Sequence, residues 1–219
     1  MSGAGADDAE APGDAVGNAA FVLALRERGL RDTAVLRAME LVPREAFAPP
    51  EHRALARRDI ALPLPCGASM TAPGTVAAML AGLRVAPGQR VLEIGTGSGY
   101  VTALLARLGA GAVLSLERYA TLAGEAAARL AGLPEVHVVR ADGLSPALPD
   151  GGFDRILVNG SVDAVPPHWL AALEPGGRLV AGLSGPDGCR IAALGPDGTP
   201  ETGATVRLAA LVPGLARVL

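Results

Sequence analysis

Residues 91–100 decide the fold: they read VLEIGTGSGY, with Gly95, Gly97 and Gly99 at alternate positions. The apolar residues before Gly95 predict a β-strand over 90–94, and the residues after Gly99 predict a helix over 100–108. Glycine lacks a Cβ atom and tolerates positive φ, so this turn lets the backbone approach a ligand closely. In a parallel sheet such a turn lies at the carboxyl ends of the strands, where ligands bind.

The alternation of strand and helix continues downstream. We expect strands over 112–117, 136–140, 154–159 and 177–183, and helices over 120–130 and 166–173. The strands are continuous apolar runs, which is typical of a buried parallel sheet. Two further strands, over 189–194 and 204–211, have no helix between them and should pair antiparallel at one edge. The sequence therefore predicts an α/β fold with a doubly wound, mostly parallel sheet and an antiparallel C-terminal edge.

The N-terminal part has a different pattern. Residues 1–16 are small, acidic and Pro-containing, and we expect a disordered tail there. Helical periodicity begins at Asn18, and a second helix begins near Asp32 or Thr33 and ends at Pro43. The Pro-rich stretch 43–73 predicts an ordered functional loop, and a helix follows from about Pro73. We expect residues 17–84 to pack on a core formed by residues 85–219, as one globular domain.

Composition argues against several classes of function. The net charge is −3, whereas nucleic-acid binding needs a basic surface, so we expect no nucleic-acid partner. The three histidines and two cysteines share no metal-ligand spacing, so we expect no metal site. No apolar run approaches the ~20 residues of a membrane helix, and the N-terminus lacks the apolar segment of a signal peptide. We therefore expect a cytoplasmic protein with reduced cysteines and no membrane partner.

The spacing of the glycines distinguishes two classes of cofactor. A dinucleotide fingerprint would place a small residue at position 100, where this chain has Tyr100. The pattern of Glu93 followed by three alternating glycines instead resembles the first motif of Rossmann-like methyltransferases, which bind S-adenosylmethionine. Glu117, some 20 residues further on, ends the next strand, where a carboxylate accepts hydrogen bonds from both ribose hydroxyls. In those methyltransferases the position of Asp142 reaches the adenine amino group.

The flanking segments narrow the resemblance to one family. Residues 42–49 (VPREAFAP), 62–73 (LPLPCGASMTAP), 156–161 (ILVNGS), 165–170 (VPPHWL) and 173–180 (LEPGGRLV) resemble motifs of the protein-L-isoaspartate O-methyltransferases. The resemblance runs from about Asn18 to Leu211. It implies methyl transfer from S-adenosylmethionine, which leaves S-adenosylhomocysteine, to the carboxylate of isoaspartyl residues in damaged proteins or peptides. It also implies a monomer or a weak homodimer.

The resemblance carries a set of site residues onto this chain. Thr71 and Ser69 would act at the catalytic position by hydrogen-bonding the substrate or the cofactor carboxylate. The cofactor would be held by Met70, Glu93, Gly95, Thr96, Gly97, Ser98, Gly99, Tyr100, Glu117, Arg118, Asp142 and Gly143. The substrate would be held by Pro65, Gly67, Asn159, Gly160 and Ser161. A carboxylate acceptor is already ionised near neutral pH, so the reaction needs alignment and exclusion of water rather than a general base.

Three departures from the family pattern keep other functions open. Thr71 replaces the family's serine, Ala68 replaces its glutamine, and Asp163 adds a carboxylate after the fourth strand of the core. One alternative is a methyltransferase of the same fold with another peptide or small-molecule acceptor, since a fold does not fix a substrate. A second is an NAD-dependent oxidoreductase, which would need a small residue in place of Tyr100. A third is a cofactor-binding protein without catalytic activity.

Overall fold

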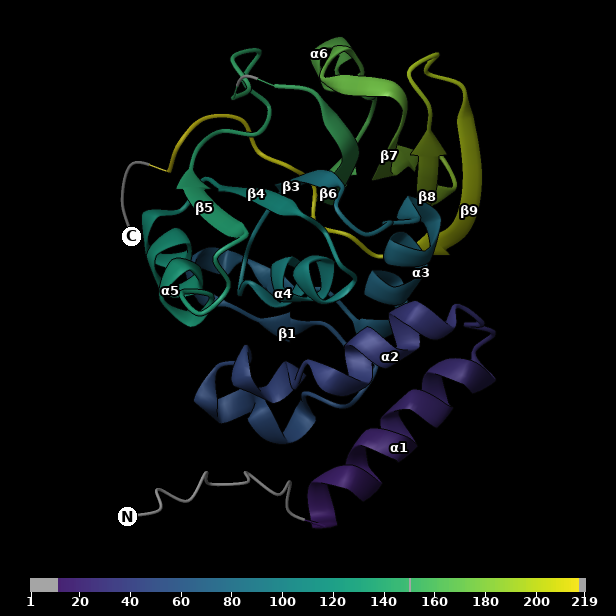
Figure 1. Ribbon diagram of the computed structural model, residues 1–219, viewed down its shortest axis with the longest axis vertical. Helices are drawn as coiled ribbons and strands as arrows, with labels where there is room; N and C mark the ends of the chain where they lie inside the picture. The colour runs from purple at the N-terminus through teal and green to yellow at the C-terminus, as the bar shows by residue number, and fades with distance from the viewer. Residues whose placement is uncertain (1–11, 150, 217–219) are drawn as a thin grey trace, which may run out of the picture.

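The computed structural model describes residues 12–149 and 151–216, and its centre is a seven-stranded sheet in the order β5-β4-β3-β6-β7-β8-β9 (Figure 1). Neighbouring strands from β5 to β7 run parallel, whereas β8 is antiparallel to both β7 and β9. The bounds of these strands are β3 Arg90–Ile94, β4 Ala112–Glu117, β5 Val136–Arg140, β6 Phe153–Val162, β7 Leu173–Gly185, β8 Gly188–Leu194 and β9 Pro200–Val206. The predicted fold class is confirmed.

Helices cover both faces of the sheet. Their bounds are α3 Pro73–Leu83, α4 Tyr100–Arg107, α5 Ala120–Arg129 and α6 Pro167–Ala171. Side chains alternate across each strand, so Val91 joins the core cluster that contains residues of α3 and α4, and Leu92 joins the cluster around Trp169 of α6. The chain reverses direction across the sheet at β3, which has β4 on one side and β6 on the other. Such a switch point opens a crevice at the carboxyl ends of the strands.

The first helix is longer than its sequence pattern predicts. Helix α1 spans Pro12–Glu27, so residues 12–16 of the expected tail are helical, and residues 1–11 lie outside the described part of the chain. Pro12 at the first helical position costs no hydrogen bond, and this explains the earlier start. Helix α2 spans Thr33–Leu41, and its N-cap Asp32 accepts a hydrogen bond of 3.0 Å from the Val35 amide, as predicted.

The Pro-rich loop is ordered around one buried arginine. It contains three short 3-10 helices, η1 Arg44–Ala46, η2 Pro50–Leu55 and η3 Pro65–Gly67, and an antiparallel pair of β1 Leu62–Pro63 with β2 Ser69–Met70. Arg44 is 2 % exposed, and its guanidinium donates to the carbonyls of Ala56, Ile60, Met70 and Thr71 over 2.6–3.4 Å. Burial lowers the pKa of Arg44 to about 10, which leaves it charged at neutral pH.

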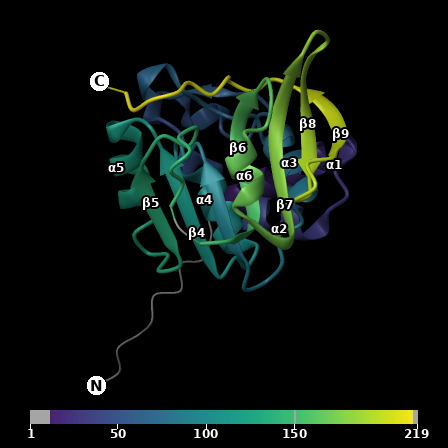
Figure 2. The ribbon, with the colours of Figure 1, turned by 90° about the horizontal axis from the view of Figure 1, so that it is seen from above.

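The C-terminal segment differs from its prediction. Strand β9 ends at Val206, and the apolar residues that predicted a strand over 204–211 instead lead the chain back across the sheet. Ser161 of β6 pairs with this segment through backbone hydrogen bonds with Ala209 and Leu211. We call residues 207–216 the strap. It follows the carboxyl edge of the sheet, as the yellow trace in Figure 2 shows.

Replacement of Arg44 tests whether it organises the loop. Arg44→Met leaves several buried carbonyls without a donor, so we expect the free energy of unfolding to fall by about 2–4 kcal/mol. Urea denaturation measures this loss. Arg44→Lys should recover less than half of it, because one ammonium cannot reproduce the fork of guanidinium donors. The matched control is Arg58→Met, at an exposed position of the same loop. We call the four hydrogen bonds of the Arg44 guanidinium the Arg44 clamp. An equal loss of stability in the Arg44 and Arg58 variants would contradict its role in ordering the loop.

Candidate functional site

A cleft opens at the switch point between β3, β4 and β6. Its walls come from the hairpin β1–β2, the ends of four strands and the strap. The predicted site residues that line it are Gly67, Ser69, Gly95, Gly97, Glu117, Arg118, Asp142, Gly143 and Asn159. Its other lining residues are Ala68, Ile94, Leu116, Tyr119, Ala141, Leu144, Ala209, Ala210, Leu211 and Val212. Segments 70 or more residues apart in the sequence therefore meet in one crevice.

The carboxylate of Glu117 joins the glycine turn to the end of β4. One oxygen accepts from the Gly97 amide at 2.9 Å, and the other accepts from the Tyr119 amide at 3.0 Å. Each oxygen of an ionised carboxylate has a second lone pair, so both can still accept from a ligand's hydroxyls. Glu117 is 5 % exposed and lines the cleft. This geometry suits a diol such as a ribose.

Asp142 joins the end of β5 to the strap. Its Oδ1 accepts from the Leu144 amide at 2.9 Å, and its Oδ2 accepts from the Gly214 amide at 2.7 Å. Arg118 donates to the Gly214 carbonyl at 2.9 Å, and Arg140 donates to the Ala216 carbonyl at 2.9 Å. The strap is thus attached at the side of the cleft where Asp142 lies.

The three glycines of the turn adopt backbone conformations that favour glycine. Gly95, Gly97 and Gly99 have φ of +93°, +55° and +87°, values that L side chains rarely adopt. A Cβ atom at Gly143 would collide with the side chain of Ile94. Gly95, Gly97 and Gly143 leave the floor of the cleft as bare backbone, which a planar ligand can approach.

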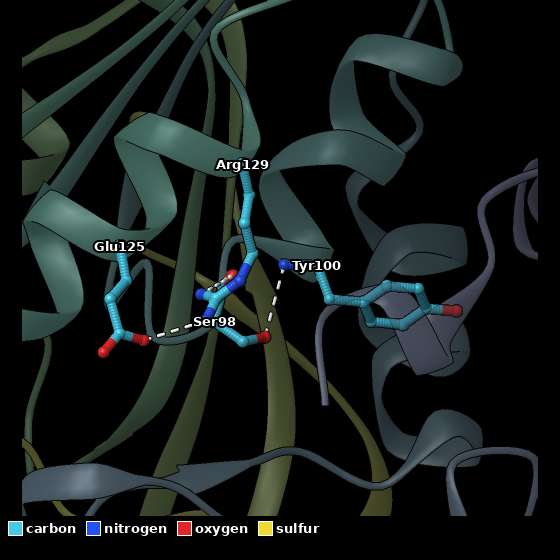
Figure 3. A network of polar contacts seen from close by, with 4 residues as sticks. All are labelled: Ser98, Tyr100, Glu125 and Arg129. Carbon is cyan, nitrogen blue, oxygen red and sulfur yellow. Dashed lines mark hydrogen bonds and ion pairs between the residues drawn. The ribbon is translucent and has the colours of Figure 1, made fainter. Parts of the chain in front are cut away.

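Two predicted cofactor residues of the turn, Ser98 and Tyr100, point away from the cleft. Figure 3 shows Arg129 reaching from α5 to the Ser98 carbonyl at 3.3 Å and to Glu125 at 2.8 Å, while the ring of Tyr100 points to the other side. That ring is 1 % exposed and packs on Phe47 with a centroid distance of 5.7 Å. Both residues hold the start of α4, and both also line a small cavity next to the cleft, so their expected roles in cofactor binding stay predictions. Gly99 also lies outside the cleft, against Leu130.

Glu93 likewise lies beneath the cleft. Its side chain is on the same face as Val91 and is fully buried; Oε2 accepts from Thr102 at 2.5 Å and from Ser115 at 2.6 Å. Thr96 bonds to the same Ser115 hydroxyl at 2.5 Å. Burial raises the pKa of Glu93 to about 7. Glu93 and Thr96 thus support the turn through Ser115, and Thr96 also lines the small cavity next to the cleft; their contact with the cofactor stays a prediction.

The predicted catalytic threonine lies in a small cavity next to the cleft. Thr71 is 8 % exposed and donates to Asn159 Oδ1 at 2.8 Å. Asn159 Nδ2 donates to the Gly95 carbonyl at 3.2 Å. Ser69, Gly97 and Asn159 line both spaces, whereas Met70 and Thr71 line only the small one. Hydroxyl and amide groups therefore meet beside the glycine turn.

Three predicted substrate residues lie elsewhere. Pro65 faces a separate hollow between the loop and α5. Gly160 and Ser161 are covered by the strap, and a Cβ atom at Gly160 would be 2.7 Å from Leu211 Cδ2 and 3.1 Å from the Ala209 carbonyl. Substrate contact by these two residues therefore stays a prediction, and the strap separates them from the cleft. Asp163 is exposed and does not line the cleft, so it does not repel an anionic ligand there.

Sequence reasoning missed the strap residues 209–212 and the clamp of Arg44. The strap has no motif of its own, and only its pairing with Ser161 brings it to the cleft. Arg44 lies in the segment 42–49, which resembles a family motif. Its partners are backbone carbonyl groups, and these leave no signal in a sequence. Within residues 12–149 and 151–216, no cluster of metal-ligating side chains and no helix that could cross a membrane are found.

The raised pKa of Glu93 predicts a pH-dependent stability. The ordinary pKa is 4.5, so between pH 4.5 and about 7 the folded state binds a proton that the unfolded state releases. The free energy of unfolding should therefore fall as pH rises through this window, by up to about 3 kcal/mol. Glu93→Gln lacks the titrating group, so its stability relative to the wild type should rise from pH 5 to pH 8 in urea denaturation. Exposed Glu174→Gln should track the wild type, and parallel wild-type and Glu93→Gln profiles would contradict the assignment.

Comparison with known proteins identifies the family. The profile of the family described as protein-L-isoaspartate(D-aspartate) O-methyltransferase (PCMT) matches residues 16–188. A protein-L-isoaspartate O-methyltransferase from Bradyrhizobium sp. strain BTAi1 is 44 % identical over 207 residues, 91 % of this chain and 95 % of the relative. One from Rhodopseudomonas palustris strain BisB18 is 49 % identical over 163 residues, 74 % of this chain and 75 % of the relative.

A solved structure supports the fold. A crystal structure from Plasmodium falciparum, described as a candidate protein-L-isoaspartate O-methyltransferase in complex with S-adenosyl-L-homocysteine, has a TM-score of 0.75. It is 19 % identical and covers 88 % of this chain and 97 % of its own. At that identity the likeness shows the fold alone. The profile match and the two bacterial relatives establish the family, and this chain belongs to the protein-L-isoaspartate(D-aspartate) O-methyltransferases.

Proposed function

We propose that this protein transfers the methyl group of S-adenosylmethionine to the carboxylate of L-isoaspartyl residues in damaged proteins or peptides. The observation that carries the proposal is the meeting of Glu117, Asp142 and the glycine turn in one cleft, directly beside the hydroxyl of Thr71. Glu117, Asp142 and the glycine turn suit a nucleoside cofactor. The Thr71 hydroxyl lies where the methyl acceptor could approach that cofactor. The relatives named protein-L-isoaspartate O-methyltransferase supply the substrate class.

The residues of the cleft fit the adenosine end of the cofactor. Glu117 has free lone pairs for the ribose hydroxyls, and Asp142 offers its carboxylate to the adenine amino group. Gly95, Gly97 and Gly143 keep the floor free of side chains, while Ile94 and Leu116 give apolar contact for a ring. When bound, the cofactor supplies an electrophilic methyl group on a sulfonium.

The chain's own contribution to catalysis is alignment and exclusion of water. A carboxylate acceptor is ionised near neutral pH, so no side chain has to remove a proton. The hairpin residues Gly67–Ser69 and the strap residues Ala209–Val212 form opposing walls of the cleft. They would hold the acceptor in line with the methyl group and keep water out.

A methyltransferase with another acceptor is the second candidate. The departure at Ala68 favours it, because Ala68 lines the cleft and offers no side-chain hydrogen bond. Asp163 does not favour it, since that carboxylate is exposed and outside the cleft.

We further propose that the protein works in the cytoplasm, where its free cysteines Cys66 and Cys189 would stay reduced. We also propose that it works as a monomer or a weak homodimer.

Binding and turnover test the two halves of the proposal. We expect S-adenosylhomocysteine to bind in calorimetry, and Glu117→Gln to raise its Kd about 10–100-fold through loss of charge-assisted hydrogen bonds. Exposed Glu27→Gln is the control and should bind like the wild type. An isoaspartyl peptide should be methylated and its aspartyl twin should not. Tight cofactor binding without methylation of the isoaspartyl peptide would favour the second candidate, and absence of binding would overturn both.

A further inference from the structure

We propose that Asn159, rather than Thr71, donates the hydrogen bond to the acceptor's carboxylate, and that the Thr71 hydroxyl acts there only as a hydrogen-bond acceptor. This inference rests on the proposed function, because it assigns roles within that same site. The family resemblance implies a substrate contact for both residues, and the inference gives the donor role to Asn159 alone. Three contacts around Asn159 carry the argument.

The Gly95 carbonyl fixes the orientation of the Asn159 amide. A carbonyl oxygen can only accept, so the amide atom 3.2 Å from it must be the NH₂ group of Asn159. An amide flipped by 180° would place two oxygens against each other. The backbone here is close-packed as well: a Cβ atom at Gly95 would be 3.3 Å from the Asn159 carbonyl. The strand pairing of β3 with β6 therefore determines which end of the amide points to Gly95.

The orientation of the amide then fixes the proton of Thr71. The remaining amide atom, Oδ1, has no hydrogen and is 2.8 Å from Thr71 Oγ1. Thr71 has one hydroxyl proton, and this contact uses it. Only lone pairs of Oγ1 remain for the cavity. A negatively charged acceptor oxygen would find no donor on Thr71 as long as this hydrogen bond persists.

The amide has one donor left. The NH₂ group carries two hydrogens, and the Gly95 carbonyl takes one of them. Asn159 lines both the cleft and the small cavity, so its second N–H is the polar hydrogen that the pair can offer to an anionic oxygen. Residue 159 therefore controls recognition of a carboxylate directly, and it controls Thr71 through the hydrogen bond between them.

Kinetics of four variants on the isoaspartyl peptide test these roles. Thr71→Val removes the hydroxyl but keeps Asn159 on Gly95, so kcat/KM should fall by no more than about threefold. Asn159→Asp replaces the N–H by an oxygen, so kcat/KM should fall at least about thirtyfold, with a higher KM. The double variant Asn159→Ala/Thr71→Val, compared with Asn159→Ala, tests whether the hydrogen bond to Asn159 occupies the Thr71 hydroxyl proton in the wild type. Without Asn159 the hydroxyl can turn to the substrate, so removing it should cost more than it does in the wild type.

Measurements of cofactor binding and stability separate a loss of acceptor recognition from a loss of cofactor or of fold. Thr71→Val should keep the wild-type Tm and the wild-type Kd of S-adenosylhomocysteine, whereas the Asn159 variants lose the hydrogen bond to Gly95, so kcat/KM is compared at saturating cofactor and below each variant's Tm. Thr205→Val on exposed strand β9 is the matched control for loss of a hydroxyl. A larger loss for Thr71→Val than for Asn159→Asp, or an equal cost of Thr71→Val in both backgrounds, would overturn the inference alone. A wild-type protein that binds S-adenosylhomocysteine but leaves the peptide unmethylated would overturn the proposed function and the inference together.

Discussion

The hydrogen bond from the Gly97 amide to the carboxylate of Glu117 is the interaction on which the site depends. It ties the turn after β3 to the end of β4 and gives the Gly97 amide a carboxylate acceptor. From below, Glu93 holds Thr102 of α4 and Ser115 of β4 together. From the side, Arg129 of α5 holds the Ser98 carbonyl. The turn is thus fixed by groups on three elements, and its backbone is left as a surface for a ligand.

The strands differ in how well their bounds could be predicted: β6 and β7 extend beyond the predicted 154–159 and 177–183. Strands β3, β4 and β5 have the predicted bounds, since glycine or a helix start follows a short apolar run in each case. The orientation of Glu93 was harder to predict. Alternation places it on the face of Val91, opposite Ile94, but which face meets the cleft depends on packing of the helices. The motif at residues 91–100 therefore contains both residues that line the cleft and residues that support it from the core.

The strap and the Arg44 clamp could not be predicted, for a common physical reason. Both depend on backbone groups far away in the sequence: Ser161 pairs with residues near 210, and Arg44 donates to carbonyls of residues 56–71. Backbone groups are the same in every residue, so such contacts leave no compositional signal. The apolar residues after Val206 were predicted to form a strand, whereas they lie exposed or half-buried beside β6 and form only an isolated bridge with it. Their apolar character was visible in the sequence, but their partner was not.

The division of labour in the fold follows from these contacts. The alternating strands and helices build the floor of the cleft, with Glu117 and Asp142 at neighbouring strand ends. Its walls come from segments outside that alternation: the hairpin before α3 and the strap after β9. A change in either wall can alter the acceptor without disturbing Glu117, because Glu117 is held by the amides of Gly97 and Tyr119, which belong to neither wall. Asn159 of β6 connects floor and wall, since its amide bonds both to Gly95 of the floor and to Thr71 beside the hairpin. Evolution of a new acceptor on this scaffold would therefore meet its strongest constraint at residue 159.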